Sequence, residues 1–247
     1  MELLFILLIF LALKTIRIVA NVRNDREWHK GLFENDQSDI HQSNDPLLEA
    51  YISLGALMVR RDTNSYREKI LYLNRYFSKN FPKTQYDFGR SFTESLKNPE
   101  QPKVITSWLR RKLPHREERI QVMYFLAGLA NVDGSMNKRE VELLKEMNIF
   151  LKLTDQDFES IVAMFRLKQE RKKSSGSEKP HKDSVQLACK IIGVPSNFTK
   201  TVLKKAYRKL VMLHHPDRFA TEAPEQQEIA EQRFLEIQKA YEILEKR

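Results

Sequence analysis

Glycine and cysteine are scarce in this chain, which has seven glycines and one cysteine, Cys189, among its 247 residues. The glycines form neither a G-x-G-x-x-G nor a G-x-x-x-x-G-K-[ST] pattern, which excludes phosphate-binding loops of the dinucleotide and P-loop types. One cysteine cannot form an internal disulfide or a C-x-x-C zinc arrangement. The chain therefore suits a reducing compartment and does not depend on cysteine chemistry.

Acidic residues are outnumbered by basic ones, 33 against 42, and the formal net charge is +9 at pH 7. This excess permits a nucleic acid, an anionic membrane surface or an acidic protein as the partner. No recognised nucleic-acid motif accompanies the basic residues, so we expect no nucleic-acid partner. The histidines at positions 29, 41, 115 and 181 have no partnered nucleophile, and no H-x-x-x-H pair is present. We therefore expect neither an enzymatic activity nor a cofactor.

Eleven consecutive apolar residues occupy positions 3–13, and the run resumes after Lys14. A helix that spans a bilayer needs about 17–25 apolar residues, so this run is short for a full span. Basic residues gather after it, which by the positive-inside rule places the rest of the chain in the cytoplasm. We predict that residues 1–22 form an apolar helix that anchors the protein in a membrane. The alternative is a buried or interfacial helix of a soluble cytoplasmic protein.

Apolar residues recur at helical spacing in the rest of the chain, and runs of alternating β-branched residues are rare. We therefore predict an all-α fold. Residues 23–44 form a polar connector, and residues 45–168 form a helical domain. Residues 169–182 form a flexible basic linker, because the stretch contains serine, glycine and proline without periodicity. A compact helical unit at residues 183–247 follows.

The helical domain contains a weak internal repeat, in which residues 54–73 align with residues 127–144. The alignment places Asp62 on Asp133, and each unit is predicted to form a helix, an Asp-containing turn and a second helix. Two such hairpins can bury their apolar stripes against each other. The arrangement, and above all the string LAGLANVDGSMNKREVELLKEM at residues 126–147, resembles the TerB-like all-helical domain.

The turn of the second repeat has some features of a calcium loop. Asp133, Ser135 and Asn137 alternate as the first ligands of such a loop do. However, glycine comes at the second place instead of the sixth, and Leu144 stands where a bidentate glutamate belongs. The spacing favours a helix end, an Asp-Gly turn and an N-cap. Asp133 and Glu140 are the residues that a metal ion would use if one were bound.

The corresponding turn of the first repeat is less suited to a metal ion. Asp62 is surrounded in the sequence by Arg60, Arg61 and Lys69, whose positive charges would repel a cation. We therefore predict that the domain holds no metal ion.

The strongest pattern lies in the last 65 residues, where Thr199 is predicted to cap the N-terminus of an amphipathic helix. One face of this helix is wholly basic, and like charges at i,i+4 spacing repel one another. We therefore expect this face to bind an acidic partner surface. The alternative is that it is only solvated surface. The basic face comprises Lys200, Lys204, Lys205, Arg208 and Lys209. The apolar face comprises Val202, Leu203, Ala206, Leu210 and Leu213.

A loop and a second helix follow the basic helix. Pro216 ends the first helix, because proline disfavours helical backbone at the preceding residue, His215. The tripeptide His215-Pro216-Asp217 is therefore predicted to lie in an exposed loop. A second helix begins near Pro224, packs antiparallel to the first, and is braced by a short helix at residues 185–192. Its apolar stripe comprises Ile229, Phe234, Ile237, Tyr241 and Leu244.

These residues resemble a J domain, the co-chaperone module of DnaJ-type proteins. The matching strings are KIIGV at 190–194, LKKAYRKL at 203–210, HHPDR at 214–218 and FLEIQKAYEIL at 234–244. In this family the HPD loop and the basic helix bind a DnaK-type ATPase chaperone and stimulate its hydrolysis of ATP. The resemblance implies that the chain itself catalyses no reaction.

The resemblance also implies a role for individual residues. His215, Pro216 and Asp217 would form the loop that triggers the ATPase of the partner, and Asp217 would pair with an arginine of that partner. The basic residues would steer and hold an acidic face of the partner. They are Lys200, Lys204, Lys205, Arg208, Lys209 and Arg218.

The order of an apolar N-terminus, a TerB-like middle and a J domain resembles the membrane-anchored DnaJ-like proteins of the DjlA type. It implies a co-chaperone at the cytoplasmic face of a membrane, which supports the folding of unfolded client proteins or a stress response. Two alternatives stay open: a TerB-like scaffold that responds to metal or stress, and a basic nucleic-acid-binding protein.

Overall fold

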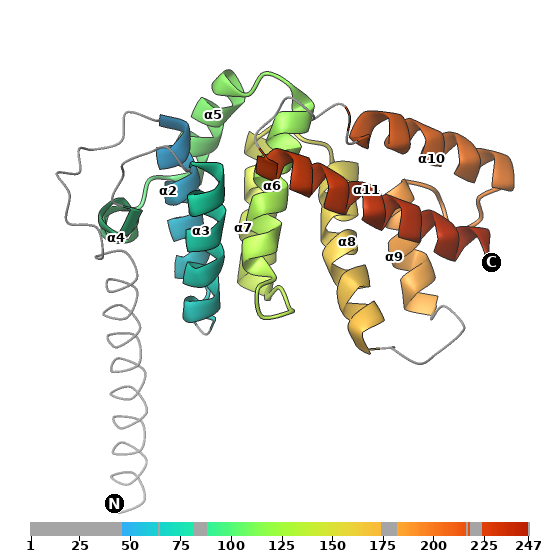
Figure 1. Cartoon of the computed structure of the whole chain (residues 1–247), viewed down its shortest axis with the longest axis horizontal. Coiled ribbons are helices and arrows are strands. Elements are labelled where there is room, and N and C mark those ends of the chain that lie inside the picture. Colours follow the sequence, from blue (N-terminus) through green and yellow to red (C-terminus); the bar gives the residue numbers. More distant parts are fainter. Residues whose placement is uncertain are drawn as a thin grey trace, which may run out of the picture.

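The computed structural model describes residues 46–63, 65–81, 88–173, 182–215, 217 and 224–246. These residues form helices and no strand, which confirms the predicted all-α fold. No helix in the described ranges combines the length and the apolarity needed to cross a bilayer. The predicted anchor (1–22) and connector (23–44) lie outside the described residues. The helices in Figure 1 are α2 (Pro46–Arg61), α3 (Tyr66–Asn80), α4 (Phe88–Lys97), α5 (Pro102–Lys112), α6 (Arg116–Ala130), α7 (Lys138–Phe150), α8 (Asp155–Lys173), α9 (Lys182–Ile192), α10 (Lys200–His214) and α11 (Pro224–Glu245).

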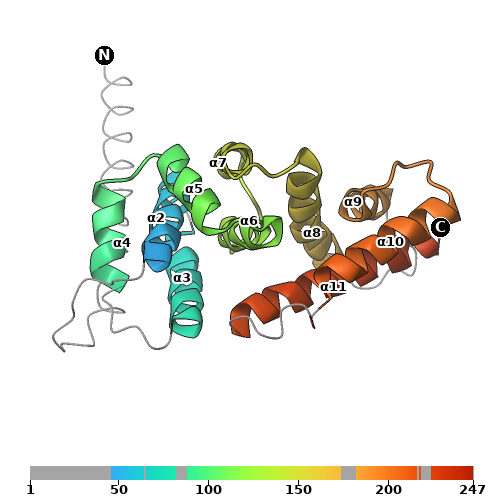
Figure 2. The ribbon, with the colours of Figure 1, turned by 90° about the horizontal axis from the view of Figure 1, so that it is seen from above.

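Two helical hairpins, α2–α3 and α6–α7, form the centre of the first helical bundle (Figures 1 and 2). Ala56 and Ala127, which the internal repeat pairs, have no exposed surface. Between the hairpins, the ring centroids of Tyr76 and Phe125 lie 4.2 Å apart. The repeat therefore corresponds to two packed hairpins, as the sequence predicts.

The turn between α6 and α7 is stabilised by local hydrogen bonds. Gly134 has a φ of +91°, which favours glycine because it has no Cβ. At the start of α7, the Asn137 side chain accepts from the Glu140 N–H at 3.0 Å, and the Glu140 carboxylate accepts from the Asn137 N–H at 2.9 Å. This capping box confirms the predicted Asp-Gly turn followed by an N-cap.

Helix α8 continues to Lys173 and therefore includes the first residues of the predicted linker, 169–182. Glutamine, glutamate, arginine and lysine, which fill positions 169–173, are good helix formers. An ion pair of 3.3 Å between Arg171 and Glu236 also joins this part of α8 to α11. The predicted linker boundary is too early, because a charged, aperiodic stretch can still extend a helix. Residues 174–181 lie outside the described residues.

Helices α9, α10 and α11 form the second unit, in which α10 and α11 lie antiparallel (Figures 1 and 2). The rings of Tyr207 and Tyr241 stack between these two helices, with centroids 4.1 Å apart. Leu203 is buried as predicted, but Val202 is 45% exposed. The prediction for Val202 is wrong, because the next residue, Leu203, which lies about 100° further around the helix, faces the core in this turn.

The two units are in contact along α8 and α9 (Figure 2). The Ser160 hydroxyl donates to the Ile191 carbonyl at 3.2 Å, and the Gln156 side-chain amide donates to the Lys190 carbonyl at 2.8 Å. These carbonyls belong to the last turn of α9, where backbone acceptors lack partners within the helix. Gly193, with a φ of +77°, ends the helix there, as predicted. The last turn of α9 is therefore satisfied by side chains of α8.

Candidate functional site

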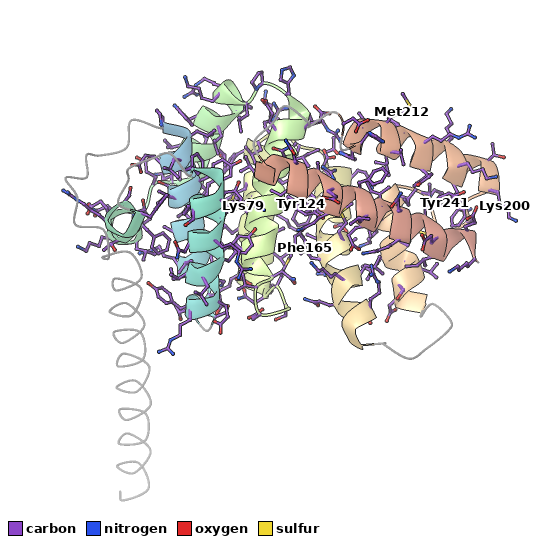
Figure 3. All side chains as sticks on the ribbon, viewed as in Figure 1. Lys79, Tyr124, Phe165, Lys200, Met212 and Tyr241 are labelled. Atoms are coloured by element: carbon purple, nitrogen blue, oxygen red, sulfur yellow. The ribbon has the colours of Figure 1, made fainter. Side chains whose placement is uncertain are left out.

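The basic face of α10 is exposed to solvent. The helix begins as predicted, because the Thr199 hydroxyl accepts from the Val202 N–H at 3.3 Å. No carboxylate of the described residues lies within ion-pair distance of the basic side chains, so their positive charge is uncompensated within that part of the chain. Lys200 marks one end of this face in Figure 3. The exposed residues are Lys200, Lys204, Lys205, Arg208 and Lys209; the sixth predicted residue, Arg218, lies outside the described residues.

The predicted loop begins where α10 ends. His214 is the last helical residue, and His215 follows in extended backbone (φ −64°, ψ 132°). The His215 ring meets the Phe234 ring edge to face, with centroids 5.7 Å apart. The Asp217 N–H donates to Nδ1 of His215 at 3.4 Å, and the Asp217 side chain is 88% exposed. Pro216 lies outside the described residues. A carboxylate this exposed is open to a cation from another molecule.

Met212 lies in the last turn of α10, one turn after Arg208, and is 73% exposed (Figure 3). It adds an apolar side chain to the end of the basic face, next to the loop. Met212 was not among the predicted residues, although the i,i+4 spacing from Arg208 places it on the basic side of the helix.

The residue just before the loop, His214, is buried against the first helical bundle. It is 3% exposed and lines a small cavity of about 10 Å³ together with residues of α6 and α11. The α6 residues are Glu117, Ile120, Gln121 and Tyr124, and the α11 residues are Ile229, Ala230 and Arg233. His214 therefore packs next to a helix that lies far from it in the sequence.

The cavity wall contains an unusual buried cation, Arg233. Burial lowers its pKa to about 10, with an opposing contribution from Tyr124, so that the guanidinium is still charged at neutral pH. Burial also raises the pKa of Tyr124. Among the residues that the structure describes, Nε of Arg233 has no hydrogen-bond partner. The proximity of Arg233 and Tyr124 between the two units was not anticipated from the sequence, since neither residue has a distinctive local pattern.

The residues considered for a metal ion do not form a shared site. Asp133 is exposed, and its carboxylate accepts from the Ser135 N–H at 2.9 Å. Glu140 is buried and accepts from Nζ of Lys69 at 2.6 Å. Lys69, which has no exposed surface, also contacts the Asp62 carboxylate at 3.1 Å. Within the described residues, no group of three or more histidine, cysteine, aspartate or glutamate side chains is arranged to hold a metal ion.

Comparison with known families matches two parts of the chain. The model of the DnaJ domain matches residues 189–247, which include α10, the loop and α11. The model described as tellurite resistance protein TerB matches residues 48–163, which include both helical hairpins. No solved structure matches the chain significantly.

Relatives among characterised proteins include two kinds of chaperone. Co-chaperone protein DjlA of Salmonella typhimurium is 32% identical over 124 residues, which cover 47% of this chain and 46% of that protein. Co-chaperone protein DjlA of Escherichia coli K12 is 29% identical over 125 residues, with the same two shares. Chaperone protein DnaJ of Thermotoga neapolitana is 54% identical over 54 residues, which cover 22% of this chain and 14% of that protein.

The matched region thus spans about half the length of the DjlA relatives. The two family matches follow each other along the chain in the order that the resemblances predict. The chain therefore contains a TerB domain followed by a DnaJ domain, an order of domains that matches the DjlA type.

Proposed function

We propose that this protein is a co-chaperone that binds a DnaK-type chaperone through its DnaJ domain and stimulates the ATPase of that chaperone. The observation that carries the proposal is the exposed basic face of α10, which leads along one helix to the exposed Asp217. The ATP is hydrolysed by the partner, so the chain itself supplies no catalytic residue. Unfolded proteins are the clients that such a pair would serve.

The two parts of this surface have different physical roles in the proposal. The lysines and arginine of α10 attract an acidic face of the chaperone, which accelerates encounter and orients the DnaJ domain. Asp217 then pairs with an arginine of the chaperone, and a charge-assisted bidentate contact of this kind fixes geometry as well as adding energy. His215, whose Nδ1 accepts from the Asp217 N–H, holds the turn in shape.

The proposal is tested by the steady-state ATPase of a purified DnaK-type chaperone with the full chain and its variants. We expect the parent to raise the rate, and Asp217→Asn and His215→Gln to leave it near the basal value. Asp133→Asn is the matched control, since it makes the same change in an exposed turn of the TerB domain. All variants should keep the helical circular dichroism of the parent. Equal stimulation by Asp217→Asn and by the parent would show that the loop has no part in the activity.

The proposal also places the protein at the cytoplasmic face of a membrane, through residues 1–22. The support is the sequence itself, in which an apolar run is followed by basic residues. Anchoring there would direct the co-chaperone to clients at the membrane surface.

A further inference from the structure

We propose that helix α6 of the TerB domain positions the ATPase-triggering loop of the DnaJ domain, through the contact with His214. This inference rests on the proposed function, since the loop must first be the part that stimulates the chaperone. His214 is the last residue of α10 and is bonded directly to His215. Any displacement of its side chain is therefore passed to the backbone of the loop.

The contact leaves His214 little freedom. The cavity that it shares with Gln121 and Tyr124 of α6 measures about 10 Å³, which is about the volume that a single water needs. Gln121 and Tyr124 are 8% and 7% exposed, so solvent does not separate the two domains here. Figure 3 shows Tyr124 beside the first turns of α11. A side chain packed this closely holds its rotamer and fixes the end of its helix.

A second set of contacts keeps the two domains in register. Ser160 and Gln156 of α8 bind the carbonyls of Ile191 and Lys190 in α9. The Lys190 ammonium also pairs with Glu159 at 2.8 Å. Because α9 in turn packs against α11, the DnaJ domain is attached to the TerB domain at α9 as well as at His214. Because the DnaJ domain is held at both places, it cannot rotate relative to the TerB domain about either contact. Helix α6 therefore stays next to His214.

The loop itself has few contacts among the described residues that could set its direction. His215 touches the ring of Phe234, and Asp217 contacts His215 within the same turn. The packed residue before the loop therefore has a large influence on where Asp217 points. The basic face of α10, by contrast, is exposed and does not depend on α6. The structure thus separates recognition of the chaperone, on α10, from orientation of the trigger, on α6.

This separation gives the positioning role its own kinetic signature. Loosening the contact should lower the maximal stimulated ATPase rate and leave the half-maximal concentration of co-chaperone unchanged. Misplacing a reacting group by about 1 Å can cost about 100-fold in rate, and a partial loss of packing should cost less, about tenfold. A role in stability alone would lower the melting temperature without this split between rate and affinity.

The test uses the full chain with Gln121→Ala and a DnaK-type chaperone, with ATPase rates measured over a range of co-chaperone concentrations. We expect about a tenfold lower maximal rate and a half-maximal concentration within about twofold of the parent. Gln121→Met conserves volume and should stimulate nearly as well as the parent. Gln169→Ala is the matched control, because it removes the same side chain from a half-buried site in α8, where Gln169 binds Asn131.

Amide hydrogen exchange without chaperone supplies an independent measurement. Exchange at residues 213–215 and at Asp217 should be faster in Gln121→Ala than in the parent and in Gln169→Ala. A parental maximal rate and parental exchange in Gln121→Ala would overturn the positioning role. If instead the parent chain fails to stimulate any DnaK-type ATPase, the proposed function is wrong and the role falls with it.

Discussion

Lys69 connects the two helical hairpins of the TerB domain through two ion pairs. Its ammonium contacts Asp62, in the turn that follows α2, and Glu140, in the first turn of α7. The Ser65 hydroxyl also donates to the Asp62 carboxylate at 3.0 Å. The three charged side chains are buried, so each depends on the others to offset the loss of water.

We predict that Lys69→Met destabilises the protein by about 3–5 kcal/mol, since it leaves two carboxylates buried without their cation. Chemical denaturation of the full chain measures the change in the free energy of unfolding. Lys138→Met is the control, because Lys138 is exposed at the start of the same helix as Glu140. The control should change stability by about 0.5 kcal/mol or less. Equal effects of the two substitutions would mean that the buried cluster contributes nothing particular.

Single residues also show which contacts a sequence can predict. The Asn137 cap of α7 and the Thr199 cap of α10 were predictable, because a cap depends on residues two or three positions away. The cluster around Lys69 was not, because its partners are 7 and 71 positions away. Lys69 was expected near Asp62 as a charge that repels a metal ion, but its pairing with Glu140 was not predicted.

At the scale of elements, α10 is the helix whose two faces have separate tasks. Leu203 is buried toward the rest of the domain, and the lysines and Arg208 face solvent. Five cations on one short helix repel one another, so this face lowers the stability of the isolated helix. An acidic partner surface would attract these cations and so offset the repulsion among them.

We predict that the double reversal Lys204→Glu and Arg208→Glu raises the half-maximal concentration for ATPase stimulation by about tenfold. Each exposed charge pair contributes about 0.2–1 kcal/mol, and reversal replaces attraction with repulsion at two positions. Stimulation by the parent should weaken as salt screens these charges, and the double variant should show a flatter salt dependence. The measurement is a series of ATPase titrations at increasing ionic strength.

The control for this prediction is Lys97→Glu with Lys103→Glu, which makes the same change in charge on α4 and α5. Both lysines are exposed, and these helices lie on the opposite side of the molecule from α10 (Figure 2). The control should titrate like the parent. A double variant of α10 with the parental half-maximal concentration and salt dependence would show that the basic face is only solvated surface.

Elements were predictable to different degrees from the sequence. The start of α10 at Lys200 and of α11 at Pro224 follow from a capping residue and a proline, which act locally. The end of α8 was misplaced, because residues 169–173 extend the helix and contact α11 through Arg171. Helix ends set by distant contacts cannot be found from local pattern alone.

At the scale of the whole molecule, the TerB and DnaJ domains pack against each other (Figures 1 and 2). The packing joins α8 to α9 and brings α6 behind His214. Gln121 belongs to no recognised motif, and the string HHPDR, which includes His214, does not indicate a contact with α6. The existence of two domains was therefore predictable from the sequence, and their interface was not.

The location of the whole molecule is a separate prediction. Deleting residues 1–22 should move the protein from the carbonate-washed membrane pellet to the supernatant, because the deletion removes the long apolar run. Fractionation and immunoblotting of the two forms measure this. A full-length protein that is already in the supernatant after the wash would contradict the anchor.

The most direct test of the account is the rate at which a DnaK-type chaperone hydrolyses one bound ATP when mixed with the full chain. A single-turnover measurement isolates hydrolysis from nucleotide release, so it reports on the step that the loop should accelerate. The account predicts acceleration by the parent and none by Asp217→Asn at the same saturating concentration. Equal rates for the two proteins, whether fast or basal, would contradict it.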